Sequence, residues 1–196
     1  MNCRFTYTIV LVAILNCVAL DAWSKADSGF DIIALGTGGG LSSDNLSAFL
    51  IGPHNLNISV ACDAGSLING IEIGVEADSF STNTKPNDYP FSLTGYILRE
   101  HIKGYLITHA HLDHIAGLLL ASPDDSPKPI YALDSVLKTI SKSYFNWQSW
   151  PNFGNSGTKP HLGKYTYLRL TDSRQQKVLN TPMLVTALPL SHSGIV

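Results

Sequence analysis

The chain has 196 residues, of which 44% are hydrophobic and only 14% are charged, and its formal net charge is -2. This length and composition allow one domain with a sizeable core. The sequence has no charge runs or low-complexity tracts, which argues against a disordered chain. The small negative charge argues against a nucleic-acid partner bound through a broad basic face. Composition alone identifies no activity.

Residues 1–26 are predicted to be a secretory signal peptide. Residues 8–20 (TIVLVAILNCVAL) are almost entirely apolar. This run is shorter than the roughly 20 residues that a membrane-spanning helix needs, and it matches the apolar part of a secretory signal. Ser24 and Ala26 place small residues before a cleavage point, so the mature chain is expected to begin at Asp27. An uncleaved N-terminal anchor is the alternative.

Cleavage would have consequences for location and for cysteine chemistry. We expect an exported protein, periplasmic or extracellular, with no stable membrane span once the signal is removed. Cys62 would remain as the single cysteine, so no intramolecular disulfide could form. Because it ends the apolar run 58–62, Cys62 is predicted to be a small buried side chain rather than a metal ligand.

The mature chain, residues 27–196, alternates between strand-like and helix-like segments. In chain order we expect strands at 31–35, 46–51 and 58–62, a helix at 66–76, a loop at 78–92, a strand at 104–108, a helix at 114–121, a strand at 130–132, a helix at 134–145, a loop at 146–163, and strands at 165–170 and 183–188. This alternation predicts a single domain of the α/β class.

A glycine run, 36–40 (GTGGG), follows the first predicted strand. It supplies the first two glycines of the dinucleotide-binding fingerprint, but Leu41 stands at the third position. A Gly-Lys-Ser/Thr sequence does not follow, which excludes a nucleotide P-loop. We therefore favour a tight turn, or the close approach of another segment, over a phosphate-binding loop.

The strongest functional signal is the stretch 109–114 (HAHLDH), which begins where an apolar strand ends. Histidine nitrogens and aspartate oxygens are standard zinc ligands. In an extended turn His109 and His111 project to the same side and can hold one metal. Once the helix begins, Asp113 and His114 turn to the opposite side and can hold a second. Two ions about 3.5–4 Å apart can activate water and stabilise the attacking and leaving oxygens of a phosphoryl displacement.

The sequence therefore predicts two divalent metal ions, with zinc favoured over iron or manganese. A chance cluster, or a histidine-rich turn with a structural role, is the alternative. Isolated histidines usually have no special role, so His54, His101 and His161 are taken as ordinary residues.

The motif HxHxDH resembles the metal-binding motif of the metallo-β-lactamase superfamily. The longer stretch 109–123 (HAHLDHIAGLLLASP) is similar over its whole length to the signature of class II cyclic-nucleotide phosphodiesterases. Segments 30–40, 45–51 and 63–71 resemble the N-terminal blocks of the same family, so the resemblance covers most of residues 30–196. It implies a metallo-β-lactamase-like αββα sandwich, of which this sequence contains the first half and the beginning of the second.

The resemblance also assigns roles to single residues. His192, within the segment 188–194 (LPLSHSG), joins His109 and His111 on the first metal, unless it is an ordinary loop histidine. Asp113 and His114 serve the second metal and are the predicted catalytic residues.

Asp63 matches the aspartate that supports the metal-binding loop, but a helix N-cap is an equal alternative. The sequence ends two residues after Gly194, before the later aspartate and histidine that complete the dinuclear site in the superfamily. We therefore expect a chain truncated at its C-terminus, with an incomplete domain.

The implied activity is hydrolysis of a 3′,5′-cyclic nucleotide, cAMP to 5′-AMP, by a hydroxide that bridges the two metals. The alternatives are another hydrolase of the same fold, acting on a thioester, lactam or lactone, and an inactive metal-binding remnant. The expected partner is the small-molecule substrate and not a nucleic acid; the sequence carries no signal for the oligomeric state. Made alone, residues 27–196 are expected to fold poorly and show little activity, since half of the sandwich face would be uncovered.

Overall fold

The computed structural model describes residues 29–40, 42–54, 56–80 and 84–191. The predicted signal peptide and His192 therefore lie outside the described residues. Within the described ranges, no helix has the length and apolar character needed to cross a membrane.

Six strands form the central sheet, with two antiparallel and three parallel pairings. The elements in chain order are β1 (Phe30–Gly36), β2 (Ala48–Pro53), β3 (Ser59–Cys62), α2 (Leu67–Glu76), α3 (Leu93–Tyr96), the π-helix η1 (Ile97–His101), β4 (Ile102–Leu106), α4 (Leu112–Ala121), β5 (Lys128–Ala132), α5 (Asp134–Thr139), the π-helix η2 (Ile140–Tyr144), β6 (Tyr165–Arg169), β7 (Gln175–Lys177) and β8 (Leu184–Thr186). The sheet order is β1-β2-β3-β4-β5-β6, and β7 pairs with β8 separately. β1, β2 and β3 run antiparallel, while β3 to β6 run parallel. The α/β prediction is confirmed.

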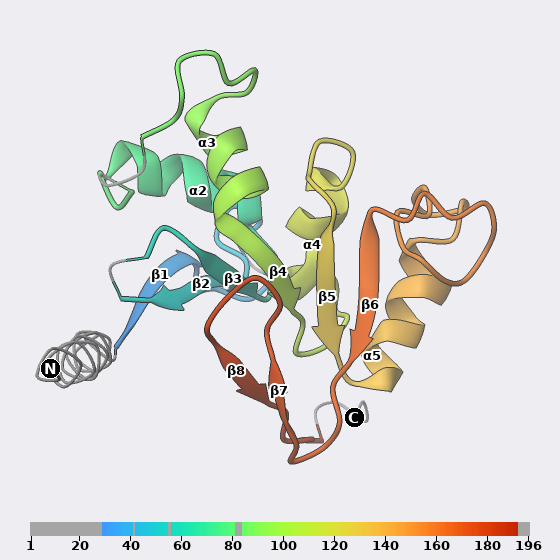
Figure 1. Ribbon diagram of the computed structural model, residues 1–196. Coiled ribbons are helices and arrows are strands. Elements are labelled where there is room, and N and C mark those ends of the chain that lie inside the picture. The colour runs from blue at the N-terminus through green and yellow to red at the C-terminus, as the bar shows by residue number, and fades with distance from the viewer. Residues whose placement is uncertain (1–28, 41, 55, 81–83, 192–196) are drawn as a thin grey trace, which may run out of the picture.

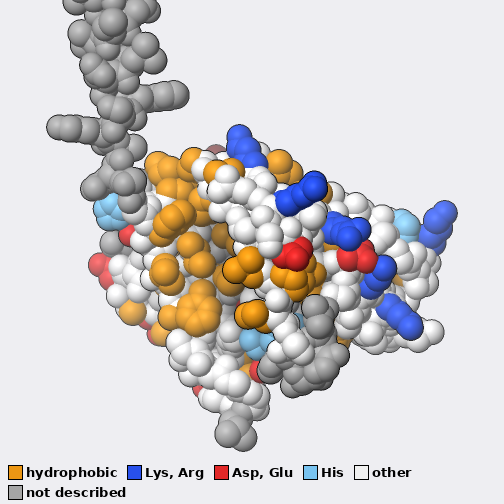
Figure 2. Space-filling view, turned by 90° about the horizontal axis from the view of Figure 1, so that it is seen from below, with side chains coloured by type: hydrophobic (Ala, Val, Ile, Leu, Met, Phe, Trp, Pro, Cys, Tyr) orange, Lys and Arg blue, Asp and Glu red, His pale blue; other side chains and the backbone are white. Residues whose placement is uncertain are grey.

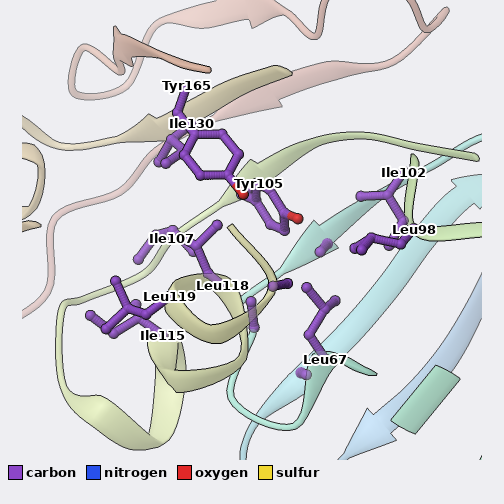
Figure 3. Close-up of a cluster of buried hydrophobic side chains, with 14 of the residues drawn as sticks. Leu67, Leu98, Ile102, Tyr105, Ile107, Ile115, Leu118, Leu119, Ile130 and Tyr165 are labelled. Carbon is purple, nitrogen blue, oxygen red and sulfur yellow. The ribbon is translucent and has the colours of Figure 1, made fainter. Parts of the chain in front are cut away.

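The helices lie on one face of this sheet, and the β7–β8 pair lies over the other (Figure 1). The larger hydrophobic cluster fills the space between sheet and helices. In α4, Ile115, Leu118 and Leu119 follow helical spacing and belong to this cluster together with Tyr105 and Ile107 (Figure 3). A smaller cluster on the opposite face joins the sheet to the hairpin; it contains Val60, Tyr131, Leu170, Val178 and Met183.

Part of the surface remains apolar. Phe30, Ile32, Leu184, Leu188 and Leu190 are among the exposed large hydrophobic side chains. In β1, Ile33 and Leu35 pack toward the helices, so alternation turns Ile32 to the opposite face of the sheet. Figure 2 shows hydrophobic side chains gathered in a broad area of the surface viewed from below.

A buried polar network joins Tyr105 of β4 to the amino ends of β5 and β6. Asp125 Oδ2 accepts hydrogen bonds from the hydroxyls of Tyr105 (2.6 Å) and Tyr165 (2.9 Å). Its Oδ1 lies 2.7 Å from Lys128 Nζ, which also donates to the Leu98 carbonyl oxygen at 2.6 Å. Burial raises the pKa of both tyrosines well above the ordinary value, so they stay protonated donors. Every member of this network therefore has a partner.

The structure differs from the expected elements in several places; besides shifts of strand ends, the expected helix 134–145 is divided into α5 and the π-helix η2. α3 and η1 lie between the expected loop 78–92 and β4, where no element was predicted; Ser92 is the N-cap of this helical segment, and its hydroxyl accepts a hydrogen bond from Gly95 N at 3.1 Å. Four residues are too few to show helical periodicity in a sequence. β7 (QQK) was not predicted, because its three residues are polar and lack the apolar alternation typical of a strand. It forms by pairing with β8. α4 begins at Leu112, earlier than position 114.

Candidate metal centre

The predicted metal loop lies where two neighbouring parallel strands end. Cys62 of β3 pairs with Leu106 of β4. The next residue, Asp63, donates its backbone N–H to the Leu106 carbonyl oxygen at 2.9 Å. Because the carboxyl ends of parallel strands meet at one edge of a sheet, Asp63 and the loop 107–111 emerge side by side. α4 then begins at Leu112, so Asp113 and His114 fall in its first turn.

The three histidine rings of the motif lie together. The ring centroids of His109 and His111 are 4.6 Å apart, and those of His109 and His114 are 4.0 Å apart. His114 Nε2 is 3.6 Å from Asp113 Oδ2. His114 was expected on the side opposite to His109 and His111, but its ring packs against the ring of His109. Because α4 begins at Leu112, its first turn brings His114 back against His109.

Asp63 anchors this loop through hydrogen bonds. Its carboxylate, 4% exposed, accepts from Thr108 N at 2.8 Å and from Thr108 Oγ1 at 2.8 and 3.0 Å. Oδ2 also lies 2.7 Å from His114 Nδ1. The N-cap position of α2 is occupied by Ser66, not by Asp63. Of the two interpretations of Asp63, a helix N-cap or a support of the metal-binding loop, the hydrogen bonds favour the support of the loop.

This contact indicates which ring nitrogen of His114 carries a proton. An ionised carboxylate is an acceptor, so the hydrogen bond places a proton on Nδ1 of His114. Nε2, on the Asp113 side of the ring, is then the nitrogen available as a ligand. A carboxylate that holds the far nitrogen of an imidazole is the usual support of a metal-binding histidine.

Backbone contacts position the start of α4. His114 O accepts from Ala64 N at 2.7 Å, and Gly117 N donates to Gly65 O at 2.8 Å. A Cβ on Gly117 would lie 2.6 Å from Leu67 N and 2.7 Å from Ala64 O. A Cβ on Gly65 would lie 2.2 Å from the Asp113 carbonyl oxygen. Glycine is therefore required at both positions, because the two backbones touch.

The glycine run makes a turn beside the same loop. Gly38 N donates to Asn45 O at 2.7 Å, and a Cβ on Gly36 would lie 1.9 Å from Leu46 O. A Cβ on Gly39 would be 4.0 Å from Asp113 Oδ2. Of the two predicted alternatives, the structure shows the close approach of another segment, the backbone of Asn45 and Leu46.

Two contributors to this site were not singled out in the sequence. Thr108 links Asp63 to the motif, and its Oγ1 is also 3.1 Å from His109 Nδ1. Tyr144, at the end of η2, donates its hydroxyl to Ala110 O at 2.9 Å. A spacing rule could find neither residue: Thr108 is an ordinary strand-end residue in the sequence, and Tyr144 is distant from the motif.

A cavity of about 410 Å³ opens beside the motif. His109 and Thr108 line it together with mostly apolar side chains, including Leu133 and Leu170. Cys62 also lines it, and burial raises the pKa of this thiol to about 11. The thiol is therefore protonated at neutral pH. The side chain itself is half-buried and not fully buried as predicted.

The donor chemistry of the motif fits divalent ions, but the side chains are not arranged as a preformed site. Across the described ranges, His, Cys, Asp and Glu side chains form no group of three or more that could hold a metal ion. Three imidazoles and one carboxylate nevertheless lie within one turn, and Asp63 orients the His114 ring. His192, the expected third ligand of the first metal, lies outside the described residues.

Comparisons with known proteins agree with this arrangement. Residues 28–196 match the family described as cAMP phosphodiesterases class-II. The chain is 45% identical to a 3′,5′-cyclic-nucleotide phosphodiesterase of Aliivibrio fischeri over 94% of this chain and 56% of that protein. It is 38% identical to a probable 3′,5′-cyclic-nucleotide phosphodiesterase of Yersinia pestis, over 86% of this chain and 49% of that protein.

The fold is also similar to a solved structure. Unliganded yeast PDE1 matches with a TM-score of 0.63 at 22% identity, over 78% of this chain and 53% of the yeast chain. The described residues therefore share the mixed α/β fold of that protein, with its central sheet. The chain belongs to the class II cAMP phosphodiesterase family. It spans about half the length of the curated relatives that it matches.

Proposed function

We propose that this chain carries the metal loop of a 3′,5′-cyclic-nucleotide phosphodiesterase that hydrolyses cAMP to 5′-AMP. The observation that supports it best is the Asp63–His114 contact of 2.7 Å, which holds an HxHxDH loop at the carboxyl end of β4. The phosphodiesterase names of the relatives support the same substrate class. A phosphoric diester is also the substrate for which a two-metal loop is suited.

The proposed ligands are those expected from the sequence. His109 and His111, with His192, would hold a first divalent ion, and Asp113 and His114 a second, with zinc favoured by the nitrogen donors. When bound, two such ions supply Lewis acidity and activate a water molecule for attack on phosphorus.

The chain's own residues orient the ligands. Asp63 keeps the proton of His114 on Nδ1, so that Nε2 keeps its lone pair. Thr108 and Tyr144 hold the loop backbone from either side through Asp63 Oδ1 and the Ala110 carbonyl oxygen. The apolar cavity beside His109 offers a small organic substrate a place with little competing water.

The experiment is a hydrolysis assay with the full-length gene product, its zinc content measured beside it. We expect cAMP to be converted to 5′-AMP, as followed by phosphorus NMR, and His111→Ala to abolish turnover. The matched control is His161→Ala, because His161 is an exposed histidine outside the motif whose Nε2 is 3.0 Å from Gly157 O. A His111→Ala protein with near-normal turnover in metal-buffered solution would refute the proposed ligand set.

Two further arms separate the alternatives. Thioester, lactam and lactone substrates are assayed in parallel; hydrolysis of one of these without hydrolysis of cAMP would assign the fold to another reaction. A protein that binds metal but hydrolyses none of these substrates would be the inactive metal-binding form.

We also propose that the protein is exported, to a periplasm or to the extracellular medium, with residues 1–26 removed. The apolar run 8–20 and the small residues before position 27 support this. Mass spectrometry of the protein recovered from the producing cells tests it: a first residue of Asp27 is expected, and an intact N-terminus on a cell-bound protein would contradict the proposal.

A further inference from the structure

The hydroxyl of Thr108 lies between two other groups of the candidate metal centre. On one side its Oγ1 is 2.8 Å from Asp63 Oδ2 and 3.0 Å from Asp63 Oδ1. On the other side it is 3.1 Å from His109 Nδ1. Asp63 Oδ2 also lies 2.7 Å from His114 Nδ1. The Asp63 carboxylate is therefore linked to two histidines of the motif, directly to His114 and through one hydroxyl to His109.

The buried carboxylate fixes the direction of the Thr108 hydroxyl. Asp63 is 4% exposed, and an ionised carboxylate only accepts hydrogen bonds. The single hydroxyl proton points to Asp63, because two oxygens 2.8 Å apart without a proton between them would repel each other. A hydrogen bond to a charged acceptor is also about twice as strong as one between neutral groups. The Thr108 oxygen is thus left as an acceptor toward His109.

This accepting oxygen determines which nitrogen of the His109 ring carries the proton. A neutral imidazole has one donor nitrogen and one acceptor nitrogen. Because Nδ1 faces the accepting Oγ1 of Thr108, the ring proton belongs on Nδ1, and Nε2 keeps the lone pair that binds a metal ion. An unconstrained histidine ring prefers the opposite form, with its proton on Nε2. The contact with Thr108 therefore acts against the intrinsic preference of the ring.

We propose that Thr108 is a positioning residue, which passes the influence of the Asp63 carboxylate to His109 and so keeps Nε2 of that ring available to the first divalent ion. The inference deepens the proposed function and rests on it, because His109 is one of the ligands proposed there. One buried carboxylate then sets the tautomer of a ligand of each ion, His109 for the first and His114 for the second.

The size of the effect follows from the exposure of Thr108. This residue is exposed, so water competes for the contact with His109, and the contact contributes no more than one ordinary hydrogen bond. One such bond corresponds to roughly fivefold in an equilibrium constant. We expect Thr108→Val to change the ratio of the two His109 tautomers by this factor and to lower the affinity for one zinc ion severalfold. Removal of the Asp63 carboxylate acts on both rings and should have a larger effect.

The test follows the ring nitrogens by ¹⁵N NMR in the full-length gene product with its metal removed, at about pH 8.5, where an ordinary imidazole is neutral. The wild-type His109 ring is expected in the Nδ1–H form. Thr108→Val should shift it toward the Nε2–H form, and Thr108→Ser, which keeps the hydroxyl, should retain the wild-type ratio. The His114 ring contacts Asp63 directly and should stay in the Nδ1–H form in both variants.

Two further variants keep the test decisive. Thr139→Val is the matched control, because Thr139 is an exposed threonine of α5 whose hydroxyl donates to Ser135 O at 3.0 Å, outside the candidate metal centre. It should change neither the His109 tautomer nor the zinc affinity. Thr108→Ala removes the same hydroxyl with a smaller side chain, and it gives the same measurement if the valine variant folds poorly.

The proposal is overturned if the wild-type His109 ring carries its proton on Nε2, or if loss of the Thr108 hydroxyl leaves the tautomer ratio unchanged. It is also overturned if the tautomer ratio changes while the zinc affinity stays at the wild-type value. Failure of the proposed function gives a different result: the tautomers and the zinc affinity respond as expected, but the wild-type protein does not hydrolyse cAMP.

Discussion

Substitution of Asp63 by asparagine tests how the metal loop is held. The φ angle of Asp63 is +55°, a conformation that asparagine also adopts readily, so the backbone should persist. In the wild-type protein the Asp63 carboxylate accepts hydrogen bonds from three donors: the N–H and the hydroxyl of Thr108 and the Nδ1–H of His114. An amide offers one oxygen and one NH₂ group, so the NH₂ group must meet one of these donors.

The structure gives the size of the effect. A hydrogen bond to a buried charged acceptor contributes about 1.5–3 kcal/mol, and we expect a loss of this order in the free energy of unfolding. If the NH₂ group faces His114, the ring proton moves to Nε2, the nitrogen nearest Asp113, and that nitrogen can no longer bind metal. Loss of a supporting carboxylate typically lowers metal affinity about 10–100-fold.

The assay is zinc affinity by competition with a chromophoric chelator, alongside urea unfolding of the metal-free protein and ¹⁵N NMR of the His114 tautomer. Thr108→Val is the matched control. It removes the hydroxyl donor but keeps the Thr108 N–H bond to Asp63, and should cost about 1 kcal/mol. A folded Asp63→Asn protein that keeps the wild-type zinc affinity and the Nδ1–H tautomer would refute the reasoning.

Three other results are expected. Gly117→Ala should lower the free energy of unfolding, measured in urea, by about 1–3 kcal/mol, because its Cβ would meet backbone atoms at 2.6–2.8 Å. Gly74→Ala, whose Cβ would meet the edge of the Phe80 ring, should lower it by less. Equal effects of the two substitutions would contradict this reasoning. Asp125→Asn should cost about 3 kcal/mol or more in the same assay by leaving the Lys128 ammonium buried without its partner, and a near-neutral result would show that the network is dispensable. Alkylation of Cys62 by iodoacetamide should be slow at pH 7 and keep accelerating up to about pH 11; a plateau near the ordinary thiol pKa, about 8.5, would contradict its burial.

The strands and the motif could be predicted because their signals are local. The apolar runs that became β1 to β6 are long enough to show in the sequence, and 109–114 contains its chemistry within six residues. The polar strand β7 lacks that signal, since its residues gain order from pairing with β8. Short helical turns such as α3 likewise depend on a single cap and on their packing neighbours.

The support of the motif depends on contacts between distant parts of the chain. Asp63 meets His114 because β3 and β4 are parallel neighbours, with Cys62 opposite Leu106. The sequence left Asp63 with two equal interpretations, since an aspartate before a helix is also a common cap. Tyr144 reaches the loop from the end of η2 through its hydrogen bond to Ala110 O, and long-range contacts of this kind cannot be read from residue spacing.

The buried Asp125 carboxylate, which joins β4 to β6, has a consequence for the loop that follows β4. If β4 slipped by one residue, Tyr105 would turn to the opposite face and Asp125 would lose a donor in the core. A slip by two residues would keep the face but carry the hydroxyl about 6.6 Å along the strand, out of reach. Tyr105 thus sets the alignment of the strand, and His109 lies four residues further along. Only Leu106, Ile107 and Thr108 lie between the two residues, so the buried Tyr105–Asp125 contact fixes the position of the first histidine relative to the sheet.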